Sequence, residues 1–277
     1  RDTLEPFARG EDITNKMIAR LDQGELPWQV PFKKSNTLQL PNNPVSKTRY
    51  RGFNIFALWA QGYEDSRWMT YNQIKKAGGS VQKGEKGTKI IFWKFIKKME
   101  DGEEVIIPLL RYYTVFNVHQ TDLDEDMHFE PSSHTIIDDY MNRENISLLP
   151  TIGRAYYRPS SDCIHLPKDE DFINNDHRLS TLFHEAIHST GHKSRLNRLS
   201  NDTYHNKAEY SKEELIAEFG SAMLCALTGT ATEEVIENSV AYIQSWRKVI
   251  KDNPEWIYRA CQDAQKALDL IENKNLK

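Results

Sequence analysis

The sequence predicts an α+β fold of two domains, and three observations lead to that prediction. The chain of 277 residues changes sign along its length, because residues 1–98 hold 18 Lys and Arg against 9 Asp and Glu, whereas residues 99–277 hold 18 against 31. Short strands and helices are expected in the basic part, and a small sheet followed by longer helices in the acidic part. One of those helices carries the motif H-E-x-x-H. We therefore expect a basic α/β domain at residues 1–120, an acidic linker at 121–131 and a second domain at 132–277.

The first domain is expected to combine short helices with a β-hairpin. Apolar residues at helical spacing predict three helices, at Glu11–Leu21, Asn54–Gln61 and Thr70–Ala77. Prolines keep Trp28–Phe32 extended, and the polar segment Lys33–Lys47 is expected to be a mobile loop. The β-rich segments Lys89–Phe95 and Glu104–Val118 are expected to pair across an acidic turn.

The second domain is expected to place a small sheet before its helices. The order predicted is a helix at Ser133–Glu144, strands at Thr151–Arg158 and Cys163–Leu166, and then four helices: the one with the motif, Glu213–Ala222, Glu233–Lys251 and Pro254–Glu272. The strand ending at Ile164–Leu166 is predicted to be an edge strand along which a peptide can pair. His165 on that strand is expected to be structural.

The H-E-x-x-H motif predicts a metal site. On a helix, His184 and His188 lie one turn apart and point the same way, so their imidazoles can hold one divalent ion. Glu185 beside them can accept a proton from a water at the metal. Asn174, Asn175 or Asp176 can cap the start of this helix, and Gly191 can end it. The alternative is a structural helix with two hydrogen-bonded histidines.

A catalytic zinc ion usually takes a third protein ligand. His192 is near in sequence but follows the expected helix end at Gly191, whereas Glu214 and Glu218 lie one turn apart on a later helix. The pattern E-x-x-x-E after H-E-x-x-H resembles the gluzincin metallopeptidases. That resemblance implies that Glu214 is the ligand and that Glu218 orients a ligating histidine. Glu218 as the ligand and a solvated acidic face remain alternatives. The expected ion is Zn²⁺, with Mn²⁺ or Co²⁺ as alternatives.

Composition restricts where the protein works. The three cysteines, Cys163, Cys225 and Cys261, are isolated and odd in number, which argues against a disulfide framework and for a reducing cytoplasm. No apolar run is long enough for a membrane span, and residues 1–6 lack the apolar core of a signal peptide. We expect a cytoplasmic protein without a membrane partner.

The basic part of the chain predicts binding to single-stranded nucleic acid. Lysines and arginines neutralise phosphates, and exposed aromatic rings stack on unpaired bases, which duplex DNA hides. The strongest candidates cluster around a glycine at a helix entry and are Arg49, Tyr50, Arg51 and Asn54. The further candidates are Trp28, Lys33, Trp68, Tyr71, Lys75, Lys83, Lys86 and Lys94. Some of these aromatic residues are expected in the core, as Trp59 is, and a lysine-rich surface also serves solubility.

Both halves of the chain carry motifs of one family. Pro27-Trp28, Tyr50-Arg51-Gly52-Phe53-Asn54, Trp68-Met69-Thr70-Tyr71 and Lys83-Gly84-Glu85-Lys86-Gly87-Thr88 resemble the N-terminal domain of ArdC-type antirestriction proteins. His184-Glu185-x-x-His188 and Glu213-Glu214-Leu215-x-Ala217-Glu218 resemble their zincin-like metallopeptidase domain. The resemblance covers nearly the whole chain; one departure is Phe32, where the family often has a second tryptophan.

The resemblance implies a conjugative-plasmid protein of a bacterial donor or recipient cell. Such a protein would bind incoming single-stranded DNA and shield it from host restriction, with a restriction enzyme or a protein substrate as a second partner. A DNA-dependent metalloprotease and a DNA-binding protein with a non-catalytic metal site are the alternatives. If peptide cleavage occurs, Tyr156, Tyr157 or Tyr204 would stabilise the oxyanion, and the sequence does not choose among them.

Overall fold

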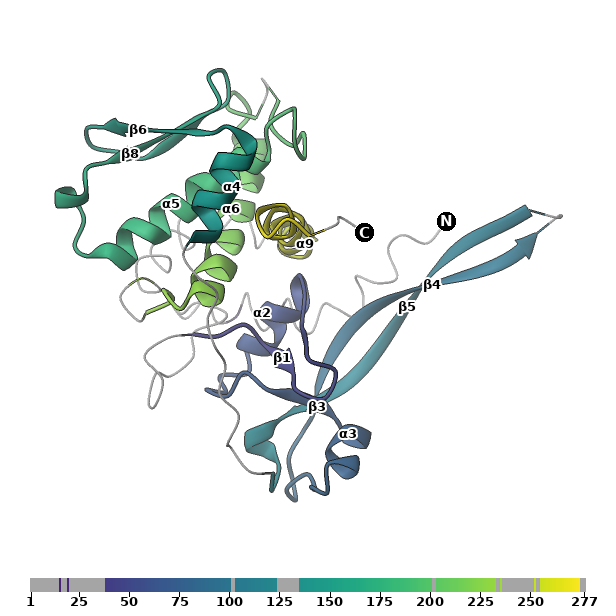
Figure 1. Ribbon diagram of the computed structural model, residues 1–277. Coiled ribbons are helices and arrows are strands. Elements are labelled where there is room, and N and C mark those ends of the chain that lie inside the picture. Colours follow the sequence, from purple (N-terminus) through teal and green to yellow (C-terminus); the bar gives the residue numbers. More distant parts are fainter. Residues whose placement is uncertain are drawn as a thin grey trace.

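The computed structural model describes residues 38–100, 103–123, 135–200, 203–232 and 255–274, with residues 15, 19, 235 and 252, and gives the backbone alone for 93–100 and 103–110. The expected helices Glu11–Leu21 and Glu233–Lys251 and the extended segment Trp28–Phe32 lie outside these ranges, as do most of the expected linker residues. Within the described ranges the α+β fold is confirmed (Figure 1). The proposed domain boundaries stay a prediction.

The basic half is built on an antiparallel sheet of three strands in the order β3–β5–β4. β4 (Thr88–Glu100) and β5 (Glu103–Asn117) form the predicted hairpin, which is longer than expected and projects from the body of the protein (Figure 1). β3 (Trp68–Thr70) pairs with the base of β5. Ile90 and Val115 are buried there against Trp68 and Tyr50, so apolar packing anchors the hairpin at its base.

Two predicted helices of this half are confirmed. α2 (Phe53–Trp59) begins after Gly52, and α3 (Tyr71–Lys76) begins after Thr70. Thr70 Oγ1 accepts a hydrogen bond from the Gln73 amide, and Gln73 Oε1 accepts one from the Thr70 amide. This reciprocal capping box satisfies backbone donors that the helix itself leaves free, and therefore fixes the start of α3. A 3₁₀ turn, η1 (Val118–Gln120), follows β5.

The prediction of a mobile loop at Lys33–Lys47 is wrong for the described residues 38–47. β1 (Asn42–Asn43) pairs with β2 (Thr48–Arg49), and Leu38 and Leu40 are buried in the main core. The Asn43 side chain is also buried. Its Oδ1 accepts hydrogen bonds from the backbone amides of Val45 and Ser46, and these bonds close the turn. The asparagines and prolines that suggested disorder here make an ordered turn instead.

The acidic half places a three-stranded sheet beside its helices. β6 (Ser147–Thr151), β7 (Tyr156–Arg158) and β8 (Cys163–Pro167) lie in the order β6–β8–β7, with β6 parallel and β7 antiparallel to β8. The predicted strand Thr151–Arg158 is divided by a turn, where Gly153 has φ of 87°. β8 is therefore the central strand, and its prediction as an edge strand is wrong, because the exposed strand Ser147–Thr151 covers its second side. A 3₁₀ turn, η2 (Asp169–Asp171), follows.

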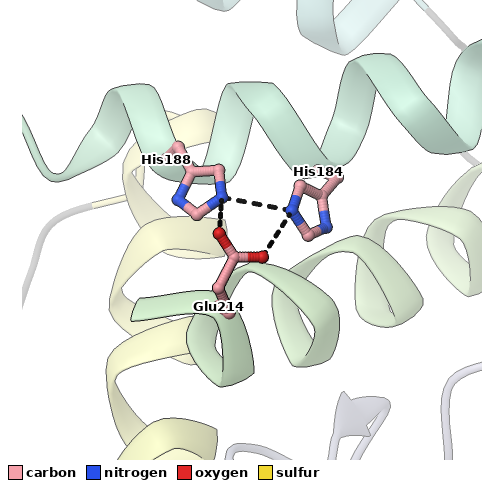
Figure 2. A group of neighbouring side chains, drawn as sticks. All are labelled: His184, His188 and Glu214. Atoms are coloured by element: carbon pink, nitrogen blue, oxygen red, sulfur yellow. Dashed lines mark hydrogen bonds and ion pairs between the residues drawn. The ribbon is translucent and has the colours of Figure 1, made fainter. Parts of the chain in front are cut away.

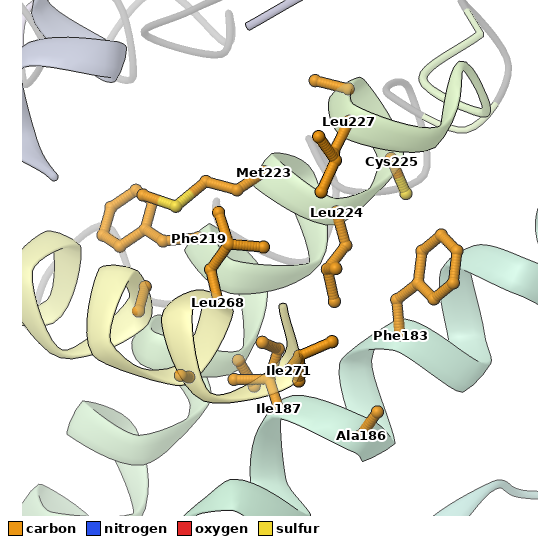
Figure 3. Close-up of a cluster of buried hydrophobic side chains, with 14 of the residues drawn as sticks. Phe183, Ala186, Ile187, Phe219, Met223, Leu224, Cys225, Leu227, Leu268 and Ile271 are labelled. Carbon is orange, nitrogen blue, oxygen red and sulfur yellow. The ribbon is translucent and has the colours of Figure 1, made fainter. Parts of the chain in front are cut away.

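Four helices of the acidic half have described bounds: α4 (Thr135–Glu144), α5 (Asn175–Thr190), α6 (Lys207–Thr228) and α9 (Glu255–Ile271). Apolar side chains of α5, α6 and α9 meet in one cluster, which includes Phe183, Phe219 and Leu268 (Figure 3). The same cluster continues into α2 of the basic half, where the ring of Phe56 lies 4.7 Å from that of Phe219. The two halves therefore share one hydrophobic core.

No helix in the described part of the chain has the length and apolarity needed to cross a lipid bilayer.

Gly220 sets the approach of α6 to α5, and its substitution tests that packing. A Cβ atom at Gly220 would lie 2.6 Å from Ile187 Cδ1 in the buried contact between the helices. We expect Gly220→Ala to lower the free energy of unfolding by about 1 kcal/mol, because overpacking outweighs the better helix propensity of alanine. Urea denaturation measures this difference.

Lys207→Ala is the control for this prediction, because Lys207 is exposed at the start of the same helix and its loss should change the free energy of unfolding by less than about 0.5 kcal/mol. A Gly220→Ala protein more stable than wild type would show that the two helices do not need this close approach.

Candidate metal centre

The helix that carries the motif is fixed at both ends. Asn174 caps α5, and its Oδ1 accepts the amide of His177 at 3.0 Å. After Thr190 the chain turns at Gly191, whose carbonyl accepts the amides of Arg198 and Leu199. His192 lies beyond this turn and bonds to Ser194 through Nδ1, so it does not share the face of His184 and His188. The alternative that His192 is the third ligand is therefore wrong in this fold.

α5 and α6 bring three donor atoms together. His184 Nε2 and His188 Nε2 are 3.1 Å apart, and they lie 3.6 and 3.5 Å from the two carboxylate oxygens of Glu214 (Figure 2). Three ligands of a tetrahedral ion, with bonds of about 2.0–2.1 Å, would be separated by about 3.3 Å. The observed separations are close to that value, with each histidine facing a different oxygen of Glu214, so the residues present fit one divalent ion held by one or both of those oxygens. They are the one such group of His, Cys, Asp and Glu found among the described residues.

Each histidine turns its other ring nitrogen toward a second carboxylate. His184 Nδ1 lies 3.1 Å from Glu218 Oε1, and His188 Nδ1 lies 3.2 Å from Glu213 Oε1. A proton on each Nδ1 leaves the lone pair of each Nε2 directed at the shared point beside Glu214. Glu218 thus has the position that its predicted role requires, at the opposite ring nitrogen of His184, and it is not among the donors that converge, which argues against it as the ligand.

Glu213 was not singled out by the sequence and is a partner of the site. Its carboxylate is 5% exposed, contacts His188 and accepts two hydrogen bonds from Arg198, at 2.9 and 3.1 Å. In the sequence, Glu213 belonged only to the alternative of a solvated acidic face. The available signal was the apolar character of α6 on nearly every side, because a glutamate on such a helix is buried and needs a cationic partner.

Electrostatics in the site favour a cation. Burial alone would lower the pKa of His184 and His188, but hydrogen bonds to Glu214, Glu218 and Glu213 outweigh it, so the pKa of His184 rises well above its usual value and that of His188 rises to about 9. Burial would raise the pKa of Glu214, but hydrogen bonds from both histidines lower it. The field that draws protons to these rings also attracts a metal ion, which binds in their place.

The carboxylate of Glu185 is held by a hydrogen bond from a backbone amide rather than by an ion pair. Its Oε2 accepts the amide of Tyr157 on β7 at 2.8 Å, and no hydrogen bond to its other oxygen is found among the described residues. The residue is 7% exposed and borders the cleft beside the two histidines. One oxygen is therefore anchored by the sheet, and the other is available to a proton.

A buried ion-pair network fixes the strand that holds Glu185. Arg195, whose side chain is 2% exposed, pairs with both oxygens of Asp162 and donates to the carbonyl of Ser189. Tyr157 donates its hydroxyl to Asp162 at 2.7 Å. Burial would raise the pKa of Asp162, but hydrogen bonds from Arg195 and Tyr157 hold it below its usual value. The network ties β7 to the segment that follows α5.

A cleft of about 570 Å³ opens over the three donors and Glu185. Of the three tyrosines considered for an oxyanion, Tyr157 uses its hydroxyl in the Asp162 network, and Tyr156 stacks on His165 and accepts a hydrogen bond from Arg158. Tyr204 borders the cleft and is half exposed. Burial and the nearby glutamates raise its pKa, so its hydroxyl keeps its proton and can donate.

The structure corrects the DNA-contact prediction for three residues of the basic half. Tyr50, Asn54 and Trp68 are 6%, 7% and 2% exposed. The Tyr50 hydroxyl donates to the Trp68 carbonyl, and the Asn54 amide bonds to the backbone of Ile91. Their polar atoms and rings are used inside the fold, and are not available to a nucleic acid strand. Trp59 is buried, as predicted.

Arg49 and Arg51 join the two halves. Arg49 Nη2 lies 2.6 Å from Glu272, and both oxygens of Asp269 on α9 pair with Arg51. Arg51 is more than half exposed, so it can still approach a ligand.

The remaining DNA-contact candidates divide by exposure. Tyr71, Lys75, Lys83 and Lys86 are exposed, and the Lys75 ammonium lies 5.9 Å from the centre of the Tyr71 ring. Trp28, Lys33 and the side chain of Lys94 lie outside what the structure describes.

Comparison with known families matches the two halves of the chain in order. The profile of the N-terminal domain of anti-restriction factor ArdC matches residues 9–116, and the profile of a zincin-like metallopeptidase matches residues 136–263. The metal-free crystal structure of the antirestriction protein ArdC from plasmid R388 is 36% identical, with a TM-score of 0.74 over 95% of this chain and 96% of that one. Its Mn(II)-bound structure gives 35% identity and a TM-score of 0.76.

Similar sequences also occur within longer proteins. The DNA primase TraC of Escherichia coli is 35% identical over 94% of this chain, and a second TraC from the same species is 34% identical. The chain spans 27% and 20% of the length of these two relatives. The uncharacterized protein y4eC of Sinorhizobium fredii is 31% identical over 94% of this chain and 90% of its own length.

The arrangement predicts a graded loss of metal affinity. Glu214→Gln should weaken the binding of Zn²⁺ or Mn²⁺ most, because it removes a charged donor, whereas Glu213→Gln and Glu218→Gln should weaken it about 10–100-fold through the histidines. Glu209→Gln, an exposed carboxylate on the same helix, is the control and should bind as wild type does. Calorimetric titration of each metal-free variant measures the order. A larger loss for Glu218→Gln than for Glu214→Gln would reverse the ligand assignment.

The Asp162 network predicts a pH dependence of stability. Because the pKa of Asp162 is lower in the folded state than in the unfolded state, its contribution is present above the unfolded pKa of about 3.9 and is lost as the pH falls through the folded pKa. We expect Asp162→Asn to be less stable than wild type at neutral pH, and the difference to shrink as the pH falls below about 4. Denaturant unfolding across this range measures it; a constant difference would assign the effect to packing.

Proposed function

The chain belongs to the ArdC family of antirestriction proteins, and from that membership we propose that it binds single-stranded DNA entering a bacterial cell by conjugation and protects it from host restriction. The observation that carries the proposal is the match of both halves, in order, to one family, with near-complete coverage of the R388 protein. The name of the TraC relatives, DNA primases, supports a role beside DNA.

The DNA-binding surface of this proposal lies in the basic half. Tyr71, Lys75, Lys83 and Lys86 are its exposed candidates, because an uncovered ring can stack on a base and the lysines can neutralise phosphates. Arg49 and Arg51 belong to the same half, at its contact with α9.

The metallopeptidase half would use a divalent ion held by His184, His188 and Glu214, with Zn²⁺ and Mn²⁺ both suited to two imidazoles and a carboxylate. When bound, the ion supplies Lewis acidity to a peptide carbonyl or to a water. Glu218 and Glu213 would keep the two imidazoles oriented, and Arg198 balances the charge of Glu213.

Proton transfer would fall to Glu185. One of its oxygens is fixed by the Tyr157 amide, so the other can accept a proton from the attacking water and deliver it to the leaving nitrogen of the cleaved peptide. Tyr204 would donate a hydrogen bond to the oxyanion, since its hydroxyl stays protonated at the mouth of the cleft. A vestigial site would not need a carboxylate anchored through one oxygen beside the cleft, which favours peptidase activity in the proposal.

Replacing Glu185 separates catalysis from binding. Glu185→Gln keeps the volume and an acceptor for the Tyr157 amide but removes the base, so we expect metal to be retained and peptide cleavage to fall by a factor of about 10²–10⁴. Protection that depends on this cleavage should fall with it, so the measurement is survival of conjugated DNA in a restricting recipient that expresses wild type or Glu185→Gln, with metal content and expression checked. Glu209→Gln is the matched control.

Loss of protection by Glu185→Gln, with metal retained, would make proton transfer part of antirestriction and direct the search to a protein substrate. Full protection would assign antirestriction to DNA binding alone. Failure of the wild-type protein to protect DNA or to bind an oligonucleotide would overturn the proposed function.

A further inference from the structure

We propose that a cavity between the basic half and α9 is a binding site for a phosphate group, with the guanidinium of Arg49 as its central donor. The cavity has a volume of about 340 Å³ and lies between the segment that leads into α2 and the end of α9. Its basic lining residues are Lys47, Arg49, Arg51 and Lys274. The site is separate from the cleft over the metal centre, which other residues line.

Arg49 uses only part of its hydrogen-bonding capacity inside the protein. Its Nη2 pairs with Glu272 at 2.6 Å, whereas its Nη1 is buried and has no hydrogen-bond partner among the described residues. A buried charged donor without an acceptor is unfavourable, so a rotation of the guanidinium that brings Nη1 to the acceptor oxygen of a ligand in the cavity would be favoured. The planar guanidinium presents its donors in a fork, which suits an anion with several oxygens.

The charge around the cavity selects an anion over water. Two carboxylates, Glu272 and Asp269, face the four cations, which leaves a surplus of two positive charges. Lys274 and Arg49 share Glu272, and Arg51 takes Asp269. Lys47 is exposed, and no ion pair of its side chain with another described residue is found. Lys47, together with Arg49 once its guanidinium turns toward the cavity, therefore supplies the charge for an incoming ligand.

A phosphate group fits this set better than a carboxylate does. Its tetrahedral oxygens can accept from Arg49 and Lys47 together, both of which line the cavity. The phosphate can belong to a DNA strand or to a free phosphate compound. DNA as the source rests on the proposed function, and the basic half that forms one wall is the half expected to follow a strand.

The cavity lies at a junction of the two halves. Glu272 follows the end of α9, and Asp269 and Gln265 on that helix hold Arg51 and the amide of Gly52. A phosphate bound by Arg49 would therefore compete with Glu272 for the guanidinium at this junction.

The first test is thermal unfolding of the full chain in inorganic phosphate and in chloride at matched ionic strength. Phosphate stabilises many proteins without binding a site, so the informative quantity is the difference between variants. Arg49→Lys keeps the ion pair with Glu272 but removes the second nitrogen, and Lys47→Ala removes the uncommitted charge. At phosphate about tenfold above its Kd, we expect wild type to gain about 2–4 °C in Tm over either variant.

Lys193→Ala is the matched control, because it removes one exposed positive charge far along the sequence from the cavity and should respond to phosphate as wild type does. Equal phosphate shifts in wild type, Arg49→Lys and Lys47→Ala would overturn the site. Because Lys47 is exposed and lies in a turn, its variant keeps the test decisive if Arg49→Lys fails to fold.

The second test identifies the source of the phosphate with a fluorescent oligothymidylate. If a DNA strand supplies it, Arg49→Lys should weaken binding about tenfold with the salt slope unchanged, because the charge is kept, whereas Lys47→Ala should reduce the slope of log K against log salt by about one. Inorganic phosphate should compete in wild type. Unchanged oligonucleotide affinity together with a variant-dependent phosphate shift would keep the site and overturn DNA as its ligand. No oligonucleotide binding by wild type would instead count against the proposed function.

Discussion

Four glutamates of the acidic half are buried close together, and the structure of that half depends on the positive charges that neutralise them. Glu185, Glu213, Glu214 and Glu218 are 7%, 5%, 4% and 8% exposed. Carboxylates so close together repel one another at low effective dielectric, and one arginine, Arg198, cannot balance them. Two histidines with raised pKa values, or a divalent ion between them, supply the missing positive charge. The positive charge at His184 and His188, whether from protons or from an ion, therefore stabilises the fold around the site as well.

The helix crossing that creates this region depends on small and apolar contacts outside the site. Gly220 lets α6 approach Ile187 of α5, and Phe219 beside it packs on Phe56 of α2. The same helix thus presents carboxylates to the histidines on one side and an aromatic ring to the basic half on the other. The packing of α6 therefore determines both the position of the metal-binding donors and the contact between the two halves.

Helices and strands were predicted well where they are fixed by residues close together in the sequence. The capping box of α3, the helix of the motif and the hairpin follow from turn residues and periodicity within a few positions. The pair His184 and His188 followed from helical spacing, and Glu214 followed from family resemblance. The apolar helix around Glu213 could have indicated its burial, but its contact with His188 and the contact of the Tyr157 amide with Glu185 depend on which elements become neighbours, so no spacing within the sequence indicates them. For the same reason β6 and the burial of Tyr50, Asn54 and Trp68 were missed.

The core shared by α2 and the helices of the acidic half has a consequence for the history of the protein. Two modules with separate cores can be exchanged independently, whereas here a break between the halves would expose Phe56 and Phe219 to water. Recombination should therefore move the entire segment as one block. The long TraC relatives match 94% of this chain within a much larger protein, which is the arrangement expected if the whole segment was transferred as one unit.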